Sequence, residues 1–381
     1  MPPPPKPTLP ASVDLAVLGG GIQGLMLAYE AAGRGLEVLL VDRQAFNQAV
    51  SRSSLRVLHG GLRYLQSADL ARFRASVQER QWFLRTFPQH TAVLPCLMPL
   101  YGRGLRRRET FFMAGLLNDA MSCRRNRGVP ASHHLGPARV IGNPELIRRF
   151  PAVPRAGLRG GAAWFDGVMT DHDGLFRTLL SRAIERGVHT REHVRVEPTA
   201  DGVRLHDGGV AGPVEVAAGL VIQTFPPADD SAPRSLAFNL VLDHPGLTTD
   251  GSAVAVDPPG RPTCFLHARD AVLGPGRLLA GTRHLVPADS DPAGPTPPQI
   301  EEFRRDLDAA VPGAGLGEAA VVEVLHGLLP AAGADTADAA KRVTLRPVPS
   351  PHPRHHALLA VKYTTARHVA RTTLDRLLLE R

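Results

Sequence analysis

The segment from Asp14 to Asp42 carries the pattern that most restricts how this chain can fold. A short apolar run, DLAVL, opens into the glycine-rich turn GGGIQG, and a second apolar run, EVLLVD, closes the segment. Between these runs, Ile22, Leu25 and Met26 recur at helical spacing. A strand, a glycine turn, a helix, a strand and an acidic residue in this order predict a dinucleotide-binding βαβ unit.

Each glycine of the turn has its own part in this prediction. Gly19 permits the tight turn, Gly21 lets the backbone approach a pyrophosphate, and Gly24 lets the helix pack closely on the sheet. The helix N-terminus offers N–H groups to phosphate, and Asp42 is placed to accept hydrogen bonds from an adenosine ribose. The alternative is a glycine-rich βα turn that binds no ligand.

Composition narrows the class of protein. No apolar run in the 381 residues approaches the ~20 residues that a membrane span needs. The proline-rich start, residues 1–11, is predicted to be a disordered tail. The net charge of +8 comes almost wholly from arginine, and the aromatic fraction of 5% is low for a protein that stacks bases, so nucleic acid is not expected as a partner. Three scattered cysteines favour a cytoplasmic protein without a metal centre.

The remaining segments predict an α/β protein with two domains. Amphipathic helices are expected over 68–87, 171–187 and 300–313, and β-rich segments between 236 and 286. The end of the chain, 357–380, is predicted to form a strand, a turn and a closing helix. This order suggests a nucleotide domain built from both ends of the chain, with a β-rich α+β domain inserted in it.

A second motif, which follows the βαβ unit, indicates the kind of nucleotide. The stretch SRSSLRVLHGGLRYLQ (51–66), with AAGRGLEVLLVD before it and KYTTAR far downstream, resembles the FAD-dependent glycerol-3-phosphate dehydrogenases, within the D-amino-acid-oxidase-like flavoenzymes. The resemblance implies a discontinuous, Rossmann-like FAD-binding domain (12–88, 150–230 and 340–381) and an inserted substrate domain (89–149 and 231–339). It also implies that the helical C-terminal domain of the bacterial dehydrogenases is missing from this chain.

The resemblance further implies which residues form the site. The implied FAD-binding residues are Gly19, Gly21, Ile22, Gln23, Gly24, Asp42, Arg43, Ser53, Ser54, His59, Gly60, Gly61, Thr224, Lys362, Tyr363, Thr364 and Thr365. The implied substrate-binding residues are Arg56, Asn239 and Arg346. The candidate bases are His59, Lys362 and His326. For His59 a second interpretation stays open, in which it anchors the glycine turn by hydrogen bonds.

Four departures from the family pattern bear on cofactor and substrate. The family's ATG strand end is here Gln223, Thr224 and Phe225, and the two glycines before K-x-T-T are Ala360 and Val361. Side chains therefore stand where backbone is expected to approach the flavin. A phosphate-binding arginine is replaced by Leu329, and a substrate-side histidine by Asn239. We therefore expect a substrate other than glycerol 3-phosphate that carries a hydroxyl or amine. Because Arg56 and Arg346 are retained, we expect it to be small and anionic.

Two further clusters each have two interpretations. Asp171, His172 and Asp173 precede a helix, where capping is favoured over a metal site because adjacent residues seldom converge on one ion. The arginine-flanked helix ETFFMAGLLNDAMSC (109–123) either packs on the substrate domain or makes a peripheral contact with an anionic membrane.

The sequence thus predicts an FAD-dependent dehydrogenase or oxidase that acts on a small molecule. It would take a hydride from a C–H bond that bears a hydroxyl or amine, with oxygen, a quinone or a protein as electron acceptor. The alternative is an inactive family member that serves as a binding or scaffold protein. An NAD-dependent reductase has only the glycine motif in its favour.

Overall fold

The computed structural model describes most of the chain. The described residues are 9–48, 50–66, 68–102, 106–207, 212–226, 233–271, 273–287, 294–333, 336–340 and 343–379. Most of the expected N-terminal tail, residues 1–8, lies outside these ranges, while Leu9 packs on a buried apolar cluster.

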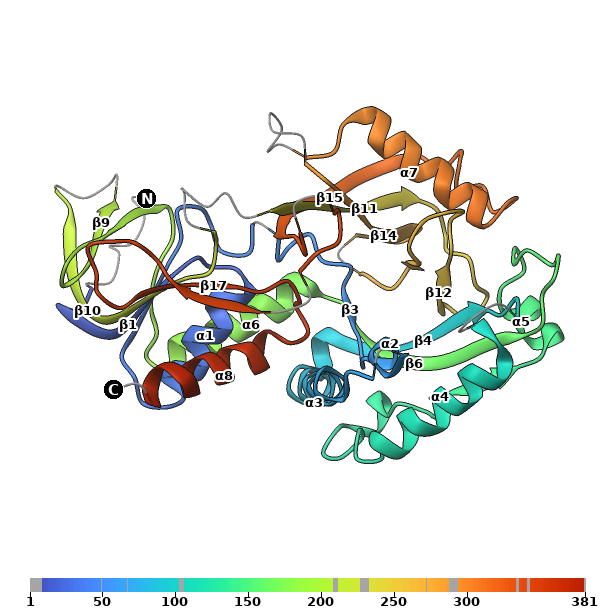
Figure 1. Cartoon of the computed structure of the whole chain (residues 1–381), viewed down its shortest axis with the longest axis horizontal. Coiled ribbons are helices and arrows are strands. Elements are labelled where there is room, and N and C mark those ends of the chain that lie inside the picture. The colour runs from blue at the N-terminus through green and yellow to red at the C-terminus, as the bar shows by residue number, and fades with distance from the viewer. Residues whose placement is uncertain are drawn as a thin grey trace.

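The first sheet holds the predicted nucleotide-binding unit (Figure 1). Its central strands are parallel. β1 lies between β2 and β10, and β10 also pairs with β17. The antiparallel strand β16 borders β17, and a β8–β9 hairpin extends from β10. Its strands are β1 (Ser12–Leu18), β2 (Val38–Val41), β7 (His189–Arg191), β8 (Val194–Pro198), β9 (Gly202–Asp207), β10 (Val214–Gln223), β16 (Thr344–Pro347) and β17 (His355–Leu359).

Three helices cover one face of this sheet (Figure 1). They are α1 (Ile22–Ala32), α6 (His172–Glu185) and α8 (Ala366–Leu379). Their buried apolar side chains form one cluster with those of β1, β2 and β17, which includes Leu25, Leu179 and Leu374. These helices form where the sequence has apolar residues at helical spacing, and this buried stripe fixes them on the sheet.

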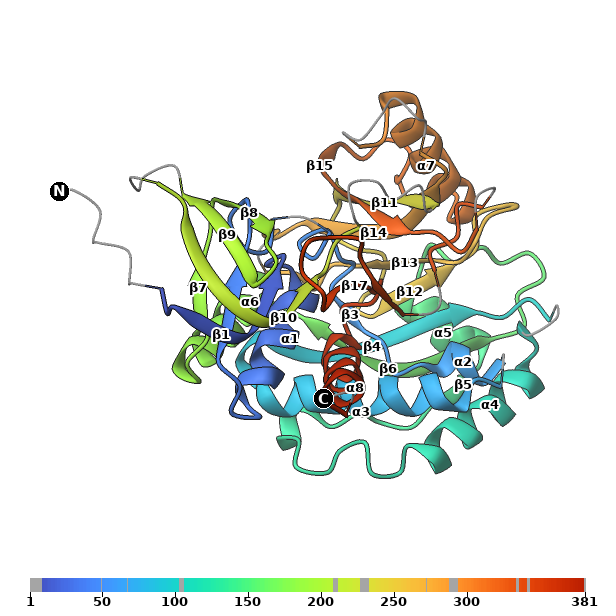
Figure 2. The same cartoon turned by 60° about the vertical axis from the view of Figure 1, so that its left-hand side comes forward.

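The second sheet is a mixed one and lies beside the first (Figures 1 and 2). It runs in the order β15-β11-β14-β13-β12-β4-β6-β3, with β5 paired to β6. Its strands are β3 (Val57–Leu58), β4 (Thr91–Pro99), β5 (Arg139–Ile141), β6 (Gly161–Met169), β11 (Arg234–Asp243), β12 (Ala253–Val256), β13 (Cys264–His267), β14 (Arg277–Leu285) and β15 (Val321–Pro330).

Helices flank the second sheet and enclose a second core. α7 (Pro297–Ala310) and α5 (Asn143–Arg149) contribute Phe303 and Leu146 to this core. On the other side lie α2 (Leu62–Gln66), α3 (Leu70–Thr86) and α4 (Arg108–Met121), with α4 at the outer edge of the molecule (Figure 2). Short 3₁₀ turns occur at η1 (Pro88–His90) and η3 (Ala131–His133).

The architecture confirms the predicted fold class, an α/β nucleotide-binding fold with a β-rich second part. The expected domain boundaries stay a prediction. Strands β3 and β6, which we expected in the nucleotide domain, hydrogen-bond within the second sheet. Among the described helices, none is both long and apolar enough to cross a membrane.

Candidate active site

The glycine turn lies at the carboxyl end of β1, where ligands bind in open α/β sheets. Gly19 adopts a φ of +112°, which favours glycine, and a Cβ on Gly24 would clash with the carbonyl oxygen of Gly19. Asp42, at the end of β2, accepts a hydrogen bond of 2.6 Å from the Gly20 N–H. Arg43 beside it is exposed. The turn therefore has the close helix–strand packing that the sequence predicts.

The N-terminus of α1 is enclosed by the loop that follows β2. The Ile22 N–H donates to Ser51 Oγ at 2.8 Å, and the hydroxyl keeps its own proton for a further acceptor. Two buried side-chain oxygens nearby, Gln23 Oε1 and Asn47 Oδ1, have no hydrogen-bond partner among the described residues. Buried polar atoms are normally paired. These atoms therefore fit a site that takes up a polar group.

The HGG motif forms a turn between β3 and α2. Gly61 has a φ of +82°, and a Cβ on Gly60 would clash with the guanidinium of Arg80. The Gly60 N–H donates to Asp166 Oδ1 at 2.7 Å, and His59 Nδ1 lies 3.2 Å from Asp166 Oδ2. Both glycines are thus required by the local geometry. The hydrogen bond to Asp166 anchors His59, in agreement with the interpretation in which this histidine holds the glycine turn.

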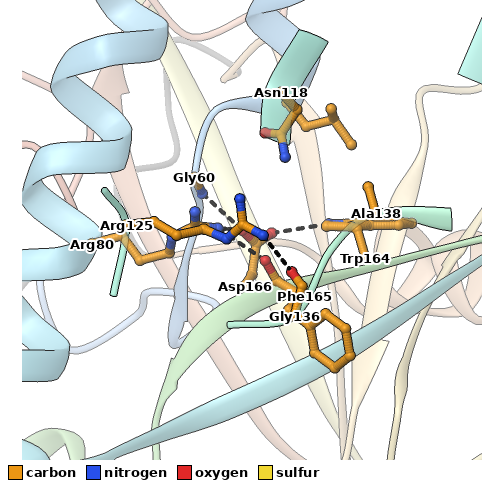
Figure 3. A pocket seen from close by; sticks show the side chains of 10 residues that line it. Gly60, Arg80, Asn118, Arg125, Gly136, Ala138, Trp164, Phe165 and Asp166 are labelled. Carbon is orange, nitrogen blue, oxygen red and sulfur yellow. Dashed lines mark hydrogen bonds and ion pairs between the residues drawn. The ribbon is translucent and has the colours of Figure 1, made fainter. Parts of the chain in front are cut away.

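Asp166 on β6 is the centre of this turn and was not among the residues predicted from the sequence. Its carboxylate also accepts from Arg80 Nη1 at 2.7 Å and Trp164 Nε1 at 3.3 Å (Figure 3). Burial disfavours its charged form, but His59, Arg80 and the Gly60 N–H outweigh burial and lower the pKa of Asp166. Asp166 stands more than a hundred positions from the HGG motif, and no local pattern connects the two.

The KYTT turn meets the HGG motif in space. Lys362 Nζ lies 4.2 Å from the ring centroid of Tyr64, which follows the HGG glycines. The Lys362 carbonyl oxygen accepts from Gln23 Nε2 at 3.1 Å, so the turn also touches α1. Tyr363 is buried in the core under this turn, with its ring beside that of His172. Thus three motifs from distant parts of the sequence come together.

The following residues, Thr364 and Thr365, lead into α8. Thr364 is buried, and the Thr365 carbonyl accepts the Val369 N–H in the first turn of the helix. The N-terminus of α8 therefore begins directly at the KYTT turn.

The end of β10 carries side chains in place of the family's glycine. Thr224 Oγ1 donates to the main-chain oxygens of Leu18 and Gly19 at 3.3 Å. The half-exposed ring of Phe225 also lies against Gly19. These side chains occupy the flank of the glycine turn and leave its backbone conformation in place.

A second group of predicted residues gathers between β11 and β15. Asn239 Nδ2 donates to the Ser53 carbonyl at 2.7 Å, and its Oδ1 accepts from Thr282 Oγ1 at 2.9 Å. Ser53 Oγ donates to the His326 carbonyl at 2.7 Å. Asn239 is buried and both ends of its amide are engaged, which gives it a structural part in joining segment 50–56 to the second sheet.

Two predicted substrate-binding arginines lie apart from each other. Arg56 is 3% exposed with a φ of +63°, and its guanidinium bonds Asp270 at 3.0 Å and Ser54 Oγ at 3.2 Å. Arg346 sits on the edge strand β16, opposite Ala357. Their roles toward a substrate stay predictions. Asp270 was not among the residues predicted from the sequence.

The DHD cluster caps a helix, as the sequence analysis favoured. Asp171 Oδ1 accepts the Gly174 N–H at 2.8 Å at the start of α6. His172 is completely buried, and its Nδ1 lies 3.2 Å from Asp173 Oδ1. Within the described ranges, no group of three or more potential metal ligands gathers.

Comparison with known proteins places this chain in a family. The model of the FAD dependent oxidoreductase family, DAO, matches residues 14–363. The chain therefore belongs to this family of FAD-dependent oxidoreductases, which confirms the resemblance drawn from the HGG and KYTT motifs.

Curated relatives agree with this assignment. The chain is 31% identical over 335 residues to glycerol-3-phosphate dehydrogenase 1 of Mycobacterium tuberculosis, covering 84% of this chain and 63% of that protein. It is 28% identical over 328 residues to glycerol-3-phosphate dehydrogenase of Synechocystis, covering 80% and 58%. The chain thus spans about three-fifths of the length of these curated relatives.

The fold is shared with solved flavoenzymes. Glycerol-3-phosphate dehydrogenase from Bacillus halodurans complexed with FAD superposes with a TM-score of 0.68 at 17% identity, covering 97% of this chain and 65% of that one. Glycine oxidase from Geobacillus kaustophilus gives 0.65 at 16% identity, covering 96% and 94%. The glycine turn and the Ser51 hydroxyl fit FAD, because its phosphates require hydrogen-bond donors. The unpartnered Gln23 and Asn47 oxygens can only accept, so they fit its hydroxyl groups.

Proposed function

We propose that this protein is an FAD-dependent oxidoreductase that oxidises a C–H bond bearing a hydroxyl or amine. The contact of the HGG motif with the KYTT turn, through Tyr64 and Lys362, is the observation that carries the proposal. Bound FAD would accept the hydride. The chain itself would hold the pyrophosphate at the N-terminus of α1, with Gly21, Ile22 and Ser51, and the ribose at Asp42.

Among the three candidate bases, the geometry favours His59. Its side chain is 44% exposed, while Nδ1 is held by Asp166. Lys362 places its ammonium on an aromatic ring, and a charged ammonium donates but does not accept. The ring of His326 lies against Gly294. We therefore assign proton removal from the substrate to His59, and charge stabilisation to Lys362.

The substrate proposed is a small anion with an oxidisable hydroxyl or amine. Asn239 of the second sheet stands where the family has a histidine, and its amide is hydrogen-bonded to Ser53 and Thr282. Leu329 stands where the family has a phosphate-binding arginine, and it carries no charge. These changes support a substrate other than glycerol 3-phosphate. The electron acceptor is open among oxygen, a quinone and a partner protein.

The visible absorption spectrum of the purified protein, before and after titration with FAD or NAD, tests the cofactor proposal. We expect flavin bands and saturable FAD uptake, with no response to NAD. Glycerol 3-phosphate, L-proline and glycine are then added anaerobically, to find which compound bleaches the flavin. A protein that takes up no FAD would contradict the proposal and favour the scaffold alternative.

We also propose that α4 docks on an anionic membrane surface. Four adjoining apolar residues of this helix are strongly exposed: Phe112 53%, Met113 63%, Leu116 51% and Leu117 47%. Exposed arginines stand at both ends of the helix, at Arg107, Arg108, Arg124 and Arg127. An apolar face with cationic flanks has the chemistry of an interfacial helix.

Co-sedimentation with vesicles tests this contact. We expect binding to vesicles that contain phosphatidylglycerol, weaker binding to phosphatidylcholine alone, and loss of binding in a Phe112→Ser/Leu116→Ser variant. Val286→Ser/Val322→Ser, which changes two exposed apolar residues elsewhere, is the control. Equal binding by both variants, or a self-associated state lost only with the α4 substitutions, would contradict membrane docking.

A further inference from the structure

The His59–Asp166 contact determines which nitrogen of the imidazole carries the proton. Asp166 is buried, and four donors surround it, from His59, Gly60, Arg80 and Trp164. Burial raises the pKa of its carboxyl, but the contacts with His59, Arg80 and the Gly60 N–H lower it further than burial raises it, so the group is ionised at neutral pH. An ionised carboxylate only accepts hydrogen bonds. The His59 Nδ1 facing it must therefore be the protonated nitrogen.

In the neutral form of the ring, the other nitrogen of His59 is then the proton acceptor. Within the described part of the chain, Nε2 of His59 has no hydrogen-bond partner, and the side chain is 44% exposed. A neutral imidazole with Nδ1–H has its lone pair on Nε2. The buried side of the ring is thus held by protein, and the basic side is open to a small molecule.

The turn around His59 is as constrained as its ring. The Gly60 N–H binds the same carboxylate at 2.7 Å, so backbone and side chain of the motif share one anchor. The Arg80 guanidinium occupies the space where a Cβ on Gly60 would stand. Arg80 also donates to the Phe165 carbonyl at 2.9 Å, which fixes the guanidinium on β6 (Figure 3). Neither His59 nor its turn can shift without breaking charged hydrogen bonds.

We propose that Asp166 is a positioning residue that fixes His59 in its Nδ1–H tautomer, so that Nε2 receives the proton of the substrate hydroxyl or amine. This inference rests on the proposed function. As the proton passes to Nε2, the hydride of the adjacent C–H bond would leave with its electron pair to the oxidant that bound FAD supplies. The carbon–oxygen or carbon–nitrogen double bond forms from the electrons of the broken O–H or N–H bond.

Asp166→Asn is the direct test, because the amide has nearly the same shape but can donate. An Nδ2–H facing His59 would favour the opposite tautomer, with the proton on Nε2. We expect ¹⁵N spectra of ring-labelled protein to show pyrrole-type Nδ1 for His59 in the wild type and pyrrole-type Nε2 in the variant. The His59 signals are assigned by their loss in His59→Asn. Unchanged ring shifts in Asp166→Asn would overturn the proposal.

Kinetics separate positioning from a purely structural role. With the panel compound that bleaches the wild-type flavin fastest, we expect kcat of Asp166→Asn to fall by about 100-fold or more, since a general base is lost. KM and FAD affinity, from flavin fluorescence, are expected to change by no more than about threefold. The control is Asn118→Ala, because Asn118 lines a small cavity together with Asp166 and Arg80 but does not hydrogen-bond to Asp166 (Figure 3). Parallel losses of FAD affinity, thermal stability and kcat in Asp166→Asn would contradict positioning.

A second variant keeps the inference testable if Asp166→Asn does not fold. Asp166→Asn leaves Arg80 charged and buried, so Asp166→Asn/Arg80→Met removes both charges and retains the amide opposite His59. We expect the same reversed tautomer in this double variant. The tautomer measurement needs no FAD, so the two proposals can be tested separately. Absence of flavin reduction in the wild type would contradict the proposed function but not the role of Asp166. Retention of the Nδ1–H tautomer in the double variant would contradict the role of Asp166 but not the proposed function.

Discussion

His355 shows how one buried side chain makes stability depend on pH. It is 3% exposed at the start of β17, and neither ring nitrogen has a hydrogen-bond partner in the described ranges. Burial, together with the neighbouring His352 and His356 charges, lowers the pKa of His355 to about 4. Because the folded protein binds this proton less readily than the unfolded chain, stability is greatest above pH 6.5 and falls as pH drops toward 4.

We therefore expect His355→Leu to reduce the acid sensitivity of the fold. Between pH 7.5 and pH 5, urea unfolding should show the wild type losing about 1 kcal/mol or more relative to the variant. His206→Gln, which changes an exposed histidine, is the control and should follow the wild type. Identical pH dependence in wild type and His355→Leu would contradict this explanation.

Among helices, α3 is joined to α1 and α8 by a cluster of three charged residues, of which Glu79 is buried. Arg367 of α8 reaches Glu30 of α1 at 2.9 Å and Glu79 of α3 at 3.4 Å, while the other Glu79 oxygen has no partner among the described residues. Burial raises the pKa of Glu79 to about 7, and the opposing charge of Arg367 only partly offsets it. A raised carboxyl pKa gives stability that is complete below pH 4.5 and is lost as pH rises through 7.

Glu79→Gln is expected to remove the loss of stability that ionisation of Glu79 causes as pH rises. Relative to the wild type, the variant should gain on the order of 1 kcal/mol in unfolding free energy between pH 5 and pH 8. Its Tm should accordingly rise relative to the wild type as pH increases, the opposite trend to that of His355. The exposed Glu318→Gln serves as the matched control. A Glu79→Gln variant that tracks Glu318→Gln across this range would show that the Glu79 carboxyl does not titrate there.

The helices were the part of the fold that sequence could predict best. Apolar residues at helical spacing located α1, α3, α6 and α7 because each buries one stripe on a sheet. The glycine turn and the HGG motif could also be found in the sequence, because the geometry of each turn depends on residues that are adjacent in the chain. Asp166 and Asp270 were not found, because single acids in distant strands have no local pattern. The two-residue strand β3 was missed as well, because it is defined only by its partner β6.

At the scale of the whole molecule, strands of the two sheets alternate along the chain. β1 and β2 precede β3 and β4, and the first sheet resumes at β7 only after β6. The buried Arg56–Asp270 pair and the Asn239–Ser53 bond tie the segment between the sheets to the second sheet. Sequence patterns could indicate an inserted second part, but not which strands would pair across such distances.

This alternation has a consequence for biosynthesis. Ser12 of β1 pairs with Ala217 of β10, and β10 in turn needs His355 of β17 beside Val221. A ribosome therefore releases the glycine turn long before the strands that complete its sheet exist. Until then the growing chain carries an apolar edge that could pair wrongly, a condition in which nascent proteins depend on protection. The nucleotide site, encoded first, is among the last parts of the molecule that can become complete.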